Sequence, residues 1–383
     1  MSDTICILLG GTLLILAAVE IYLTILHGRG RAGPLSEAIN RGTWRVQRLL
    51  VVPLSRGRRH RVLNALGPLL LPALIAVLIA VLLTGFALLY FPIMPGGFTV
   101  NAPASRWHDA FYFSGTTLLT VGYGDIVPRT GAARFLALGE ATAGLGVISL
   151  SVAYLLSVYG ALERKRTVAL SFYHQAGEGA DAAGFIAHHF VAGDFRGLDS
   201  ALNTAARDLQ SLLEAHLEHP IIHYFHPIEV HKSLPRMLFL SLEICAVMRA
   251  CLDPRAHAGA ADHPARHTLE RTARYVLTGL IAALRLESTS RRRHAEPRGI
   301  LERRWRTRFE QTLERFRETG IQSAPDRAVG WESYRRERDE WEPSLQRFAA
   351  YLGYEWEEIT GDRDLAYAAQ EEEEPAPASP PAE

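Results

Sequence analysis

Residues 120–125, with the sequence Thr-Val-Gly-Tyr-Gly-Asp, place two glycines, a hydroxyl and a carboxylate between two long apolar runs. A cation that leaves water needs oxygen ligands to replace its hydration shell, and inward-facing backbone carbonyls can supply them. This alternating backbone geometry requires positive φ at some residues, which glycine adopts without steric penalty. Gly122 and Gly124, two residues apart, meet that demand, and Thr120 adds a hydroxyl at the inner end. The stretch therefore predicts a cation site made largely of backbone.

Three apolar runs are long enough to cross a bilayer, which needs about 20 residues: Ile5–Leu26, Leu63–Phe91 and Phe135–Tyr159. Many arginines and a single acid, Glu37, separate the first two runs, and basic residues 164–166 follow the third. Lys and Arg accumulate in cytoplasmic loops of membrane proteins. We therefore expect a multi-pass protein of the cell (inner) membrane, with its N-terminus outside and its C-terminal domain in the cytoplasm.

The segment between the second and third runs must bring the glycines to membrane depth. Pro92, Pro95, Gly96 and Gly97 predict an irregular outer segment, after which Ser105 can cap a helix over residues 106–118. That helix is too short to cross the membrane, so it can enter only if the chain turns back. Non-helical backbone is tolerated at that depth only when it is buried in protein or lines a wet cavity. Residues 120–125 are the predicted returning leg.

Residues 105–159 resemble the pore module of potassium channels, whose selectivity filter carries the same TVGYG sequence. The resemblance follows the order of the family's parts: pore helix Trp107, Asp109, Ala110, Tyr112 and Phe113, outer mouth Asp125 and Pro128, inner-helix start Gly131 and Arg134, and gating hinge Gly144. It implies K⁺ as the permeant ion, with no cofactor and no catalytic residue. One pore loop per chain implies a homotetramer, because a ring of four carbonyls needs four chains.

The resemblance also assigns roles to individual residues. The filter that binds the ions comprises Thr120, Val121, Gly122, Tyr123 and Gly124. We expect Tyr112 and Phe113 to pack behind this filter. Asp125 either attracts cations to the mouth or bonds to Tyr112 and braces the filter, and the resemblance favours bracing.

Four residues mark departures or open questions. Leu119 stands where many relatives carry a hydroxyl, and Thr116 where some carry a carboxylate, so cavity block and filter inactivation cannot be assumed. Glu140 lies inside the third run, where an ionisable group is costly. It is either a brace bonded to Ser114, Thr117 or a neighbouring chain, or a charge that tunes conductance. Glu20 in the first run either bonds through Thr24 or exchanges protons at the lipid face.

The predicted fold class is an all-α membrane protein with a soluble α-helical C-terminal domain. We divide the chain as follows: an extra membrane helix over 1–27, a basic cytoplasmic loop with a possible interfacial helix over 28–62, a pore module over 63–160 (outer helix 63–91, pore helix 106–118, filter 120–125, inner helix 133–159), a regulatory helical domain over 161–370, and a disordered acidic tail over 371–383. Ser233 is expected to cap the central helix of the regulatory domain.

A cluster of histidines, His216, His219, His223, His226 and His231, is the sharpest feature of the C-terminal domain. Imidazoles bind transition metals and titrate near neutral pH. However, Pro220 and Pro227 interrupt the segment and no cysteine joins it, so an aromatic turn between two helices is the favoured interpretation. The sequence names no regulatory ligand.

Composition excludes several other classes. The formal net charge is zero, which offers no bulk attraction to nucleic acid. No nucleophile, metal or phosphate-loop motif supports an enzyme. We therefore expect a passive potassium channel, bathed in membrane lipid and gated at its inner helices by the C-terminal domain. The alternative is a membrane-anchored sensor or scaffold with a vestigial pore, which the intact filter sequence disfavours.

Overall fold

The computed structural model describes residues 2–27, 33–51, 54–101, 103–176, 181–286 and 298–361. Helices dominate these residues, which confirms the predicted all-α class. The predicted acidic tail over 371–383 lies outside the described residues. The chain divides into two compact units, Met1–Ala161 with Leu217–Phe225, and Leu162–His216 with His226–Glu383. We call them the membrane unit and the C-terminal unit.

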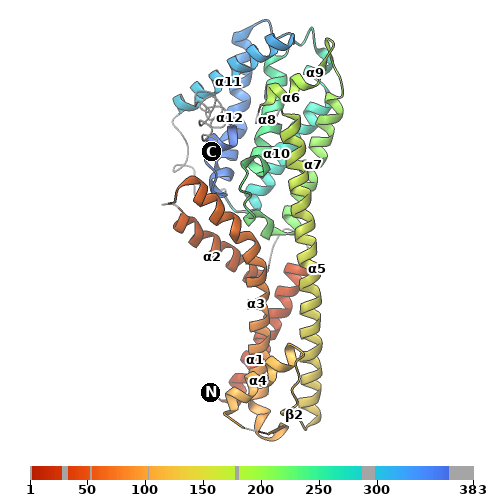
Figure 1. The fold of residues 1–383 in the computed structure, drawn as a ribbon, viewed down its shortest axis with the longest axis vertical. Helices are drawn as coiled ribbons and strands as arrows, with labels where there is room; N and C mark the ends of the chain where they lie inside the picture. The colour runs from red at the N-terminus through yellow and green to blue at the C-terminus, as the bar shows by residue number, and fades with distance from the viewer. Residues whose placement is uncertain are drawn as a thin grey trace, which may run out of the picture. The chain divides into compact units, whose positions relative to one another are not determined.

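Among the described residues, three helical segments have the length and composition of membrane spans: Asp3–Leu26, Gly57–Gly97 and Gly131–Gln175. The first combines α1 (Asp3–Ile21) with the π-helical turn η1 (Tyr22–Leu26). The second is most of α3 (Arg56–Gly97), and the third is α5 (Gly131–Gln175). Figure 1 shows α5 continuing without a break beyond the predicted end of the inner helix at residue 159, because no proline interrupts the polar residues that follow.

The irregular outer segment predicted from Pro92 and Pro95 is wrong, because α3 remains helical to Gly97. Pro95 has no N–H to donate to the carbonyl of Phe91, four residues earlier. The Nε atom of Arg106 donates to that carbonyl instead, at 2.6 Å. A side chain from a later helix therefore satisfies the acceptor that the proline leaves, as happens where prolines persist in membrane helices.

Close contact between glycines joins α1 to α3 (Figure 1). A Cβ atom added to Gly10 would lie 2.7 Å from the carbonyl oxygen of Gly85, and one added to Gly85 would lie 2.8 Å from Leu14. Small residues let membrane helices approach closely enough for extensive dispersion contact. The first apolar run therefore has a small residue where it packs on the second.

Glu20 holds the beginning of α2 (Pro34–Val51), the helix of the basic loop. Its carboxylate accepts hydrogen bonds from the backbone N–H of Leu35 and of Ser36, each at 2.9 Å, and from the hydroxyl of Thr24. These N–H groups belong to the first turn of α2, where no intrahelical acceptor exists. The contact through Thr24 is present as predicted, and Glu20 in addition caps α2 from a neighbouring helix.

A segment from far along the chain, Leu217–Phe225, belongs to the membrane unit, and we call it the coupling segment. His219 lies 2.9 Å from the hydroxyl of Ser157 on α5, through its Nε2 atom, and packs edge-on against the ring of Tyr154. A Cβ on Gly67 of α3 would lie 2.7 Å from the ring of Phe225. The segment therefore contacts both long helices of the unit.

The C-terminal unit is built around α8 (Leu234–Cys251), almost all of whose residues are buried. Ser233 caps this helix by accepting the N–H of Arg236, as the sequence predicts. The other elements are α6 (Ala182–His188), β3 (Phe190–Val191), β4 (Asp194–Phe195), α7 (Leu198–Glu218), the 3₁₀ turn η3 (Val230–Lys232), α9 (Ala258–Ala261), α10 (Pro264–Ala283), α11 (Arg298–Thr319), α12 (Arg327–Tyr351) and α13 (Trp356–Thr360).

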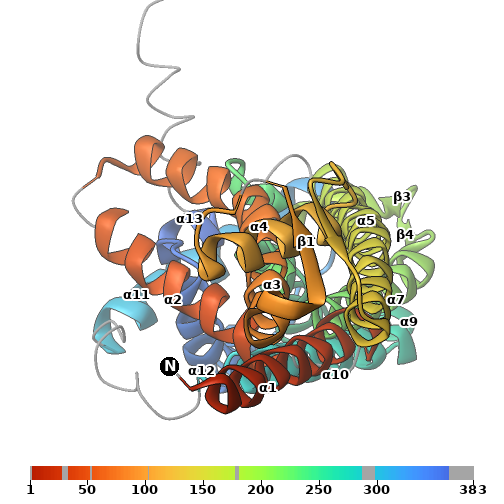
Figure 2. The ribbon, with the colours of Figure 1, turned by 90° about the horizontal axis from the view of Figure 1, so that it is seen from below.

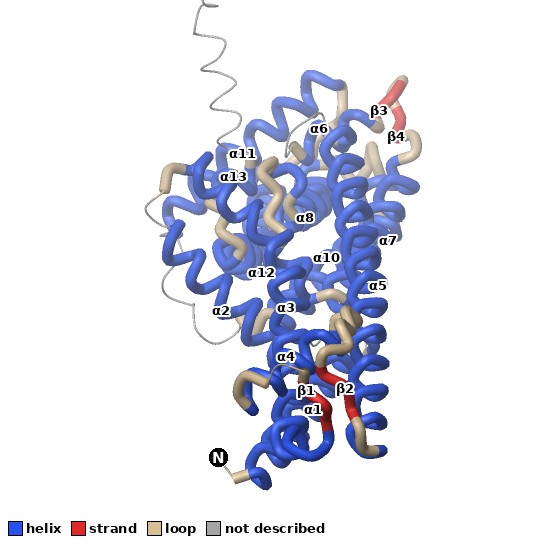
Figure 3. The backbone as a smooth tube through the Cα atoms, turned by 60° about the horizontal axis from the view of Figure 1, so that its bottom comes forward, coloured by secondary structure: helices blue, strands red, loops and turns tan. Residues whose placement is uncertain are grey.

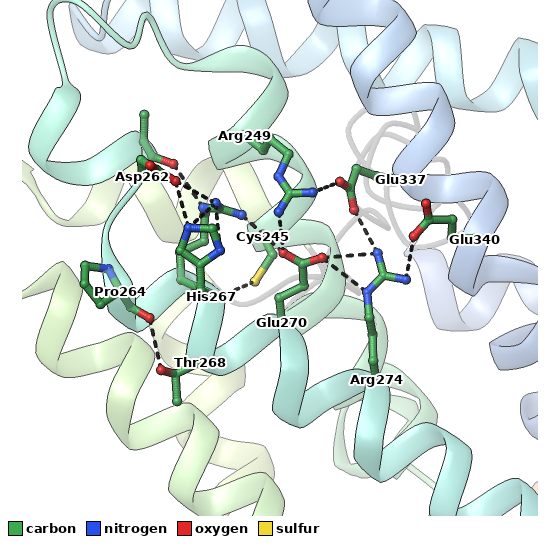
Figure 4. A network of polar contacts seen from close by, with 12 residues as sticks. Cys245, Arg249, Asp262, Pro264, His267, Thr268, Glu270, Arg274, Glu337 and Glu340 are labelled. Atoms are coloured by element: carbon green, nitrogen blue, oxygen red, sulfur yellow. Dashed lines mark hydrogen bonds and ion pairs between the residues drawn. The ribbon is translucent and has the colours of Figure 1, made fainter.

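Ion pairs connect the central helices of the C-terminal unit. Figure 4 shows Arg249 of α8 between Glu270 of α10 and Glu337 of α12, and Arg274 of α10 bonded to the same Glu337 at 2.9 Å. Deeper in the unit, Arg338 is 2% exposed and pairs with Glu243 and Glu342, so this buried guanidinium has carboxylate partners on two helices. A buried pair of this kind is costly to break from one side.

Candidate ion-binding site

The site begins with α4 (Arg106–Leu118), which has the bounds expected from the sequence. The Ser105 hydroxyl accepts the N–H of His108 and caps the helix. Arg106 fixes its first turn, since the guanidinium donates to Asp3 of α1 at 3.1 Å and to the carbonyl of Pro92 at 3.0 Å. The ring of Trp107 stacks on Phe91 at 3.9 Å between centroids. Figure 2 shows α4 and β1 (Phe98–Val100) beside α3.

The loop after α4 has the alternating backbone that the glycines predict. Gly122 has φ +58° and Gly124 φ +80°, in the left-handed region. The sequence did not indicate that Thr120 also has positive φ, at +56°. A non-glycine residue pays roughly 1–3 kcal/mol for such a conformation, so the surrounding structure must hold it. Positive φ at these three alternate positions gives the loop a regularly alternating backbone conformation.

Hydrogen bonds from the end of α4 hold this backbone. The carbonyl of Thr116 accepts both the N–H of Val121, at 2.8 Å, and the N–H of Gly122, at 3.2 Å. The N–H of Thr120 donates to the carbonyl of Thr117 at 3.0 Å. Thr116 thus stabilises the loop through its backbone carbonyl, a role that the sequence alone does not indicate.

The outer end of the loop is pinned at Asp125. Its carboxylate lies near the hydroxyl of Tyr112, as the bracing interpretation requires. Its backbone carbonyl accepts the N–H of Asn101 at 3.1 Å. Immediately beyond, β2 (Ile126–Pro128) pairs antiparallel with β1 (Phe98–Val100), and Figure 3 shows this pair in red. The loop is therefore tied down at both ends.

The ring contacts of Phe113 in the single chain are with α3 and β1. Its ring lies 5.0 Å from that of Tyr90 and 4.8 Å from that of Phe98, between centroids. These rings belong to α3 and β1, so Phe113 faces the outer helix. In the single chain Val121 and Tyr123 of the loop remain exposed, Tyr123 by 74%.

Glu140 of α5 is completely buried and joins three helices. The hydroxyl of Tyr90 on α3 donates to Oε2 at 2.7 Å, and Ser114 of α4 bonds to Oε1. Of the two predicted roles, the brace through Ser114 is the one present. Tyr90 was not foreseen as a partner, because nothing in its spacing from residue 140 predicts the contact.

Gly144 lies against the end of the pore helix. A Cβ added there would fall 2.1 Å from the carbonyl oxygen of Leu118. Helix α5 runs uninterrupted through this position. The residue is therefore required for a close approach, in addition to any part it has as a hinge. Leu119, which directly follows α4, is half exposed in the single chain.

The histidines do not assemble into a metal site within the described part of the chain, where no group of three or more His, Cys, Asp or Glu is arranged to hold an ion. His219 and His223 belong to the membrane unit, whereas His216 and His226 belong to the C-terminal unit. His216 bonds to the carbonyl of Leu212 at 2.7 Å, and His226 to that of Leu352 at 3.1 Å, each through Nδ1. The favoured interpretation, a structural turn, agrees with these contacts.

The family model described as "Ion channel" matches residues 76–160, which include the second half of α3, the pore helix, the loop and the first two thirds of α5. Residues 76–160 are an ion-channel domain. The predicted resemblance is thereby confirmed for this part of the chain. The chain as a whole is a membrane protein with further segments on both sides of the ion-channel domain.

Relatives extend the comparison beyond this domain. An uncharacterized membrane protein of Bacillus subtilis, YdjJ, is 31% identical over 232 residues, which are 59% of this chain and 64% of that protein. The two pore potassium channel c of rice, Oryza sativa subsp. japonica, is 36% identical over 69 residues, 18% of this chain and 15% of that protein. Protein LctB of Bacillus caldotenax is 39% identical over 72 residues, 16% of this chain and 53% of that protein. This chain thus covers less than two thirds of each.

No solved structure matches the chain significantly.

Proposed function

We propose that this protein is a potassium-selective channel that conducts K⁺ passively down its electrochemical gradient, with K⁺ as permeant ion and no cofactor. The observation that carries the proposal is the backbone of residues 120–124, with positive φ at three alternate positions beneath a capped pore helix. Such a backbone presents carbonyl oxygens that replace the hydration shell of K⁺. The potassium channel of rice, similar over 69 residues of this chain, adds support for this ion.

The proposed assembly is a homotetramer around a central filter, in the inner membrane. The ion-channel domain contains one pore loop, which supplies one quarter of each carbonyl ring. The exposed side chains of the single chain support this arrangement. The side chains of Val121 and Tyr123 in the filter loop are exposed, and Leu138, Leu145 and Val152 form an exposed row along α5 at seven-residue spacing. A row with that period suits packing between helices of neighbouring subunits.

Gating is proposed to act through the coupling segment. This segment contacts α3 at Gly67 and α5 at Ser157, near the cytoplasmic end that the arginine distribution predicts. It continues directly from α7, whose last residue is Glu218. A movement of α7 therefore passes along the chain to the coupling segment and, through the contacts of His219 with Tyr154 and Ser157, to the inner helix, where apolar residues can close a pore by dewetting.

The test is ion flux into liposomes that contain the purified full-length protein. We expect K⁺ uptake to exceed Na⁺ uptake by at least 100-fold, roughly the discrimination that about 3 kcal/mol provides. Equal uptake of the two ions would contradict selectivity. Absence of any flux, from folded protein, would favour the membrane-anchored scaffold.

Two glycine variants test whether the flux depends on the backbone of residues 120–124. Gly122→Ala should abolish K⁺ uptake, because alanine is strained at φ +58° even though no atom lies within 4 Å of the added Cβ. Gly11→Ala is the matched control, since it also meets no atom within 4 Å and has ordinary helical backbone. Its uptake should equal that of the unmodified protein.

A further inference from the structure

The C-terminal unit contains a pocket of about 340 Å³, within the range of small-molecule sites. Five segments meet there: the β3–β4 hairpin, the first turn of α7, the end of α8, the loop that contains α9, and the start of α10. The hairpin is one of the red strand pairs in Figure 3. Its turn consists of Ala192 and Gly193, both with positive φ, which is the backbone conformation of a tight two-residue hairpin turn.

The floor of this pocket is apolar. Leu202 of α7 and Met248 of α8 are fully buried beneath it, and Leu198 and Ala260 are nearly so. One wall is aromatic, because the ring of Phe195 lies 5.2 Å from that of His257, between centroids. The half-buried ring of Phe195 is thus the main apolar surface that a ligand can cover there.

The rim is acidic. Asp194 and Asp199 both line the pocket, from the hairpin and from α7 respectively. Asp194 accepts its neighbour's N–H through Oδ1 at 2.8 Å, and a carboxylate retains acceptor sites beyond one such bond. No lysine or arginine is among the lining residues of this pocket. The rim thus presents two negative charges above an apolar floor.

The two histidines of the pocket do not neutralise this charge. His257 accepts the N–H of Gln322 through Nε2 at 3.1 Å, which requires an unprotonated Nε2. Burial lowers the pKa of His257, against the opposing effect of Asp253 and Asp194, so the ring is neutral at pH 7. His263 accepts the N–H of Ala265 through Nδ1 and caps α10. Both rings are held by the fold in neutral, acceptor-bearing forms.

We propose that this pocket binds a small organic cation, with an ammonium or guanidinium head and an apolar body of about ten heavy atoms. The head pairs with Asp194 and Asp199 and lies near the face of Phe195, as cations do on aromatic rings. A bare metal ion fits less well, since no described group of three ligating side chains surrounds any point in the structure. The apolar floor would also remain uncovered by a metal ion.

The position of the pocket gives this ligand a regulatory role, and this step rests on the proposed channel function. Asp199 and Leu202 belong to the first turns of α7, whose other end leads into the coupling segment. A helix of 21 residues is about 30 Å long and rigid enough to transmit a displacement. Binding at one end of α7 therefore biases the contacts that the coupling segment makes with α5.

Binding is tested first, on the full chain in detergent, by calorimetric titration with 2-phenylethylamine. The neutral isostere 2-phenylethanol and Ca²⁺ are titrated in parallel. We expect saturable binding of the amine, at least tenfold weaker binding of the alcohol, and none of Ca²⁺. Equal affinity for the alcohol, no saturable binding of the amine, or binding of Ca²⁺ at this pocket would overturn the proposal.

Variants then locate the site. Asp194→Asn with Asp199→Asn should weaken amine binding at least tenfold, while circular dichroism shows an unchanged helical content. Glu214→Gln, an exposed acid on the same helix α7 outside the pocket, is the matched control and should bind as the unmodified protein does. Unchanged binding by the double variant would place the amine elsewhere and overturn the assignment.

Flux is measured last, because an amine can also block a pore directly. An effect that acts through the pocket disappears in the double aspartate variant, whereas direct block persists in it. Binding at the pocket without any difference in flux between the two proteins would overturn the regulatory step. Since the binding titration needs no ion flux, failure of the channel proposal and failure of the pocket proposal give different results.

Discussion

A glycine is required at position 144 because a carbonyl oxygen lies against it. Family resemblance suggests a flexible hinge at this position, yet the structure has continuous helix and a neighbouring oxygen 2.1 Å from where a Cβ would stand. That oxygen belongs to Leu118, the last residue of the pore helix. A displacement of α5 at this point therefore acts directly on the base of the loop that follows the pore helix.

The contact at Gly144 predicts an asymmetry between two neighbouring glycines. Gly144→Ala should destabilise the protein by about 1–3 kcal/mol and reduce K⁺ uptake, because overpacking must displace the pore helix. Gly146→Ala should be tolerated, since no atom of the chain lies within 4 Å of its added Cβ. Thermal unfolding and liposome flux measure both effects. Equal losses in the two variants would favour helix flexibility over the steric contact.

At this scale the sequence predicted the positive φ of the two loop glycines, but not the contacts that support the loop. Gly122 and Gly124 follow from local sterics. The positive φ of Thr120 depends instead on bonds to the end of α4, and Tyr90, one partner of Glu140, lies on a helix fifty residues earlier. Contacts between distant segments leave no periodic signal in the chain.

Among the elements, the coupling segment has the clearest response to pH. Burial lowers the pKa of His219 from its ordinary value of 6.5, and Glu218, 3.9 Å away, opposes this only in part. Tyr154 and Ser157 of α5 are the other polar side chains that contact it. The neutral ring is thus the form that fits, and the segment's stability is complete above pH 6.5 and lost as the pH falls from 6.5 toward the lowered pKa.

Acid should therefore loosen the coupling segment. Between pH 7.5 and 5.5, after correction for intrinsic exchange, hydrogen–deuterium exchange of residues 219–225 should increase, by at most about tenfold per pH unit for one proton. His219→Gln should remove this dependence, because glutamine can bond to Ser157 without titrating. His188→Gln, at an exposed histidine of α6, should keep it. A pH response that survives His219→Gln would assign it to another group.

Element types were predictable, whereas several element ends were not. The pore helix follows from a capping serine and its length, and has the expected bounds. The outer helix runs past Pro92 and Pro95 because Arg106 satisfies a freed carbonyl, a contact that only the folded chain makes. The inner helix continues to Gln175 because polar residues after the membrane run are good helix formers.

For the whole molecule, the proposed stoichiometry can be measured by mixing subunits. If equal amounts of unmodified and Gly122→Ala chains assemble at random into tetramers, only about one sixteenth of channels contain four intact filters. Potassium uptake should then fall to about 6% of that from the unmodified chain alone, if one altered filter blocks a channel. Uptake near one quarter would indicate dimers instead. Gly11→Ala mixed in the same proportion serves as the control and should leave uptake unchanged.

The carboxylate of Glu20 also constrains how the chain enters the membrane. Its backbone donors, Leu35 and Ser36, are made fifteen and sixteen residues after it. During synthesis, the first apolar helix is therefore complete before its acidic group has those partners, and an unpaired charge is costly in hydrocarbon. The two backbone bonds to Glu20 can therefore form only after the first turn of the next helix has been synthesised.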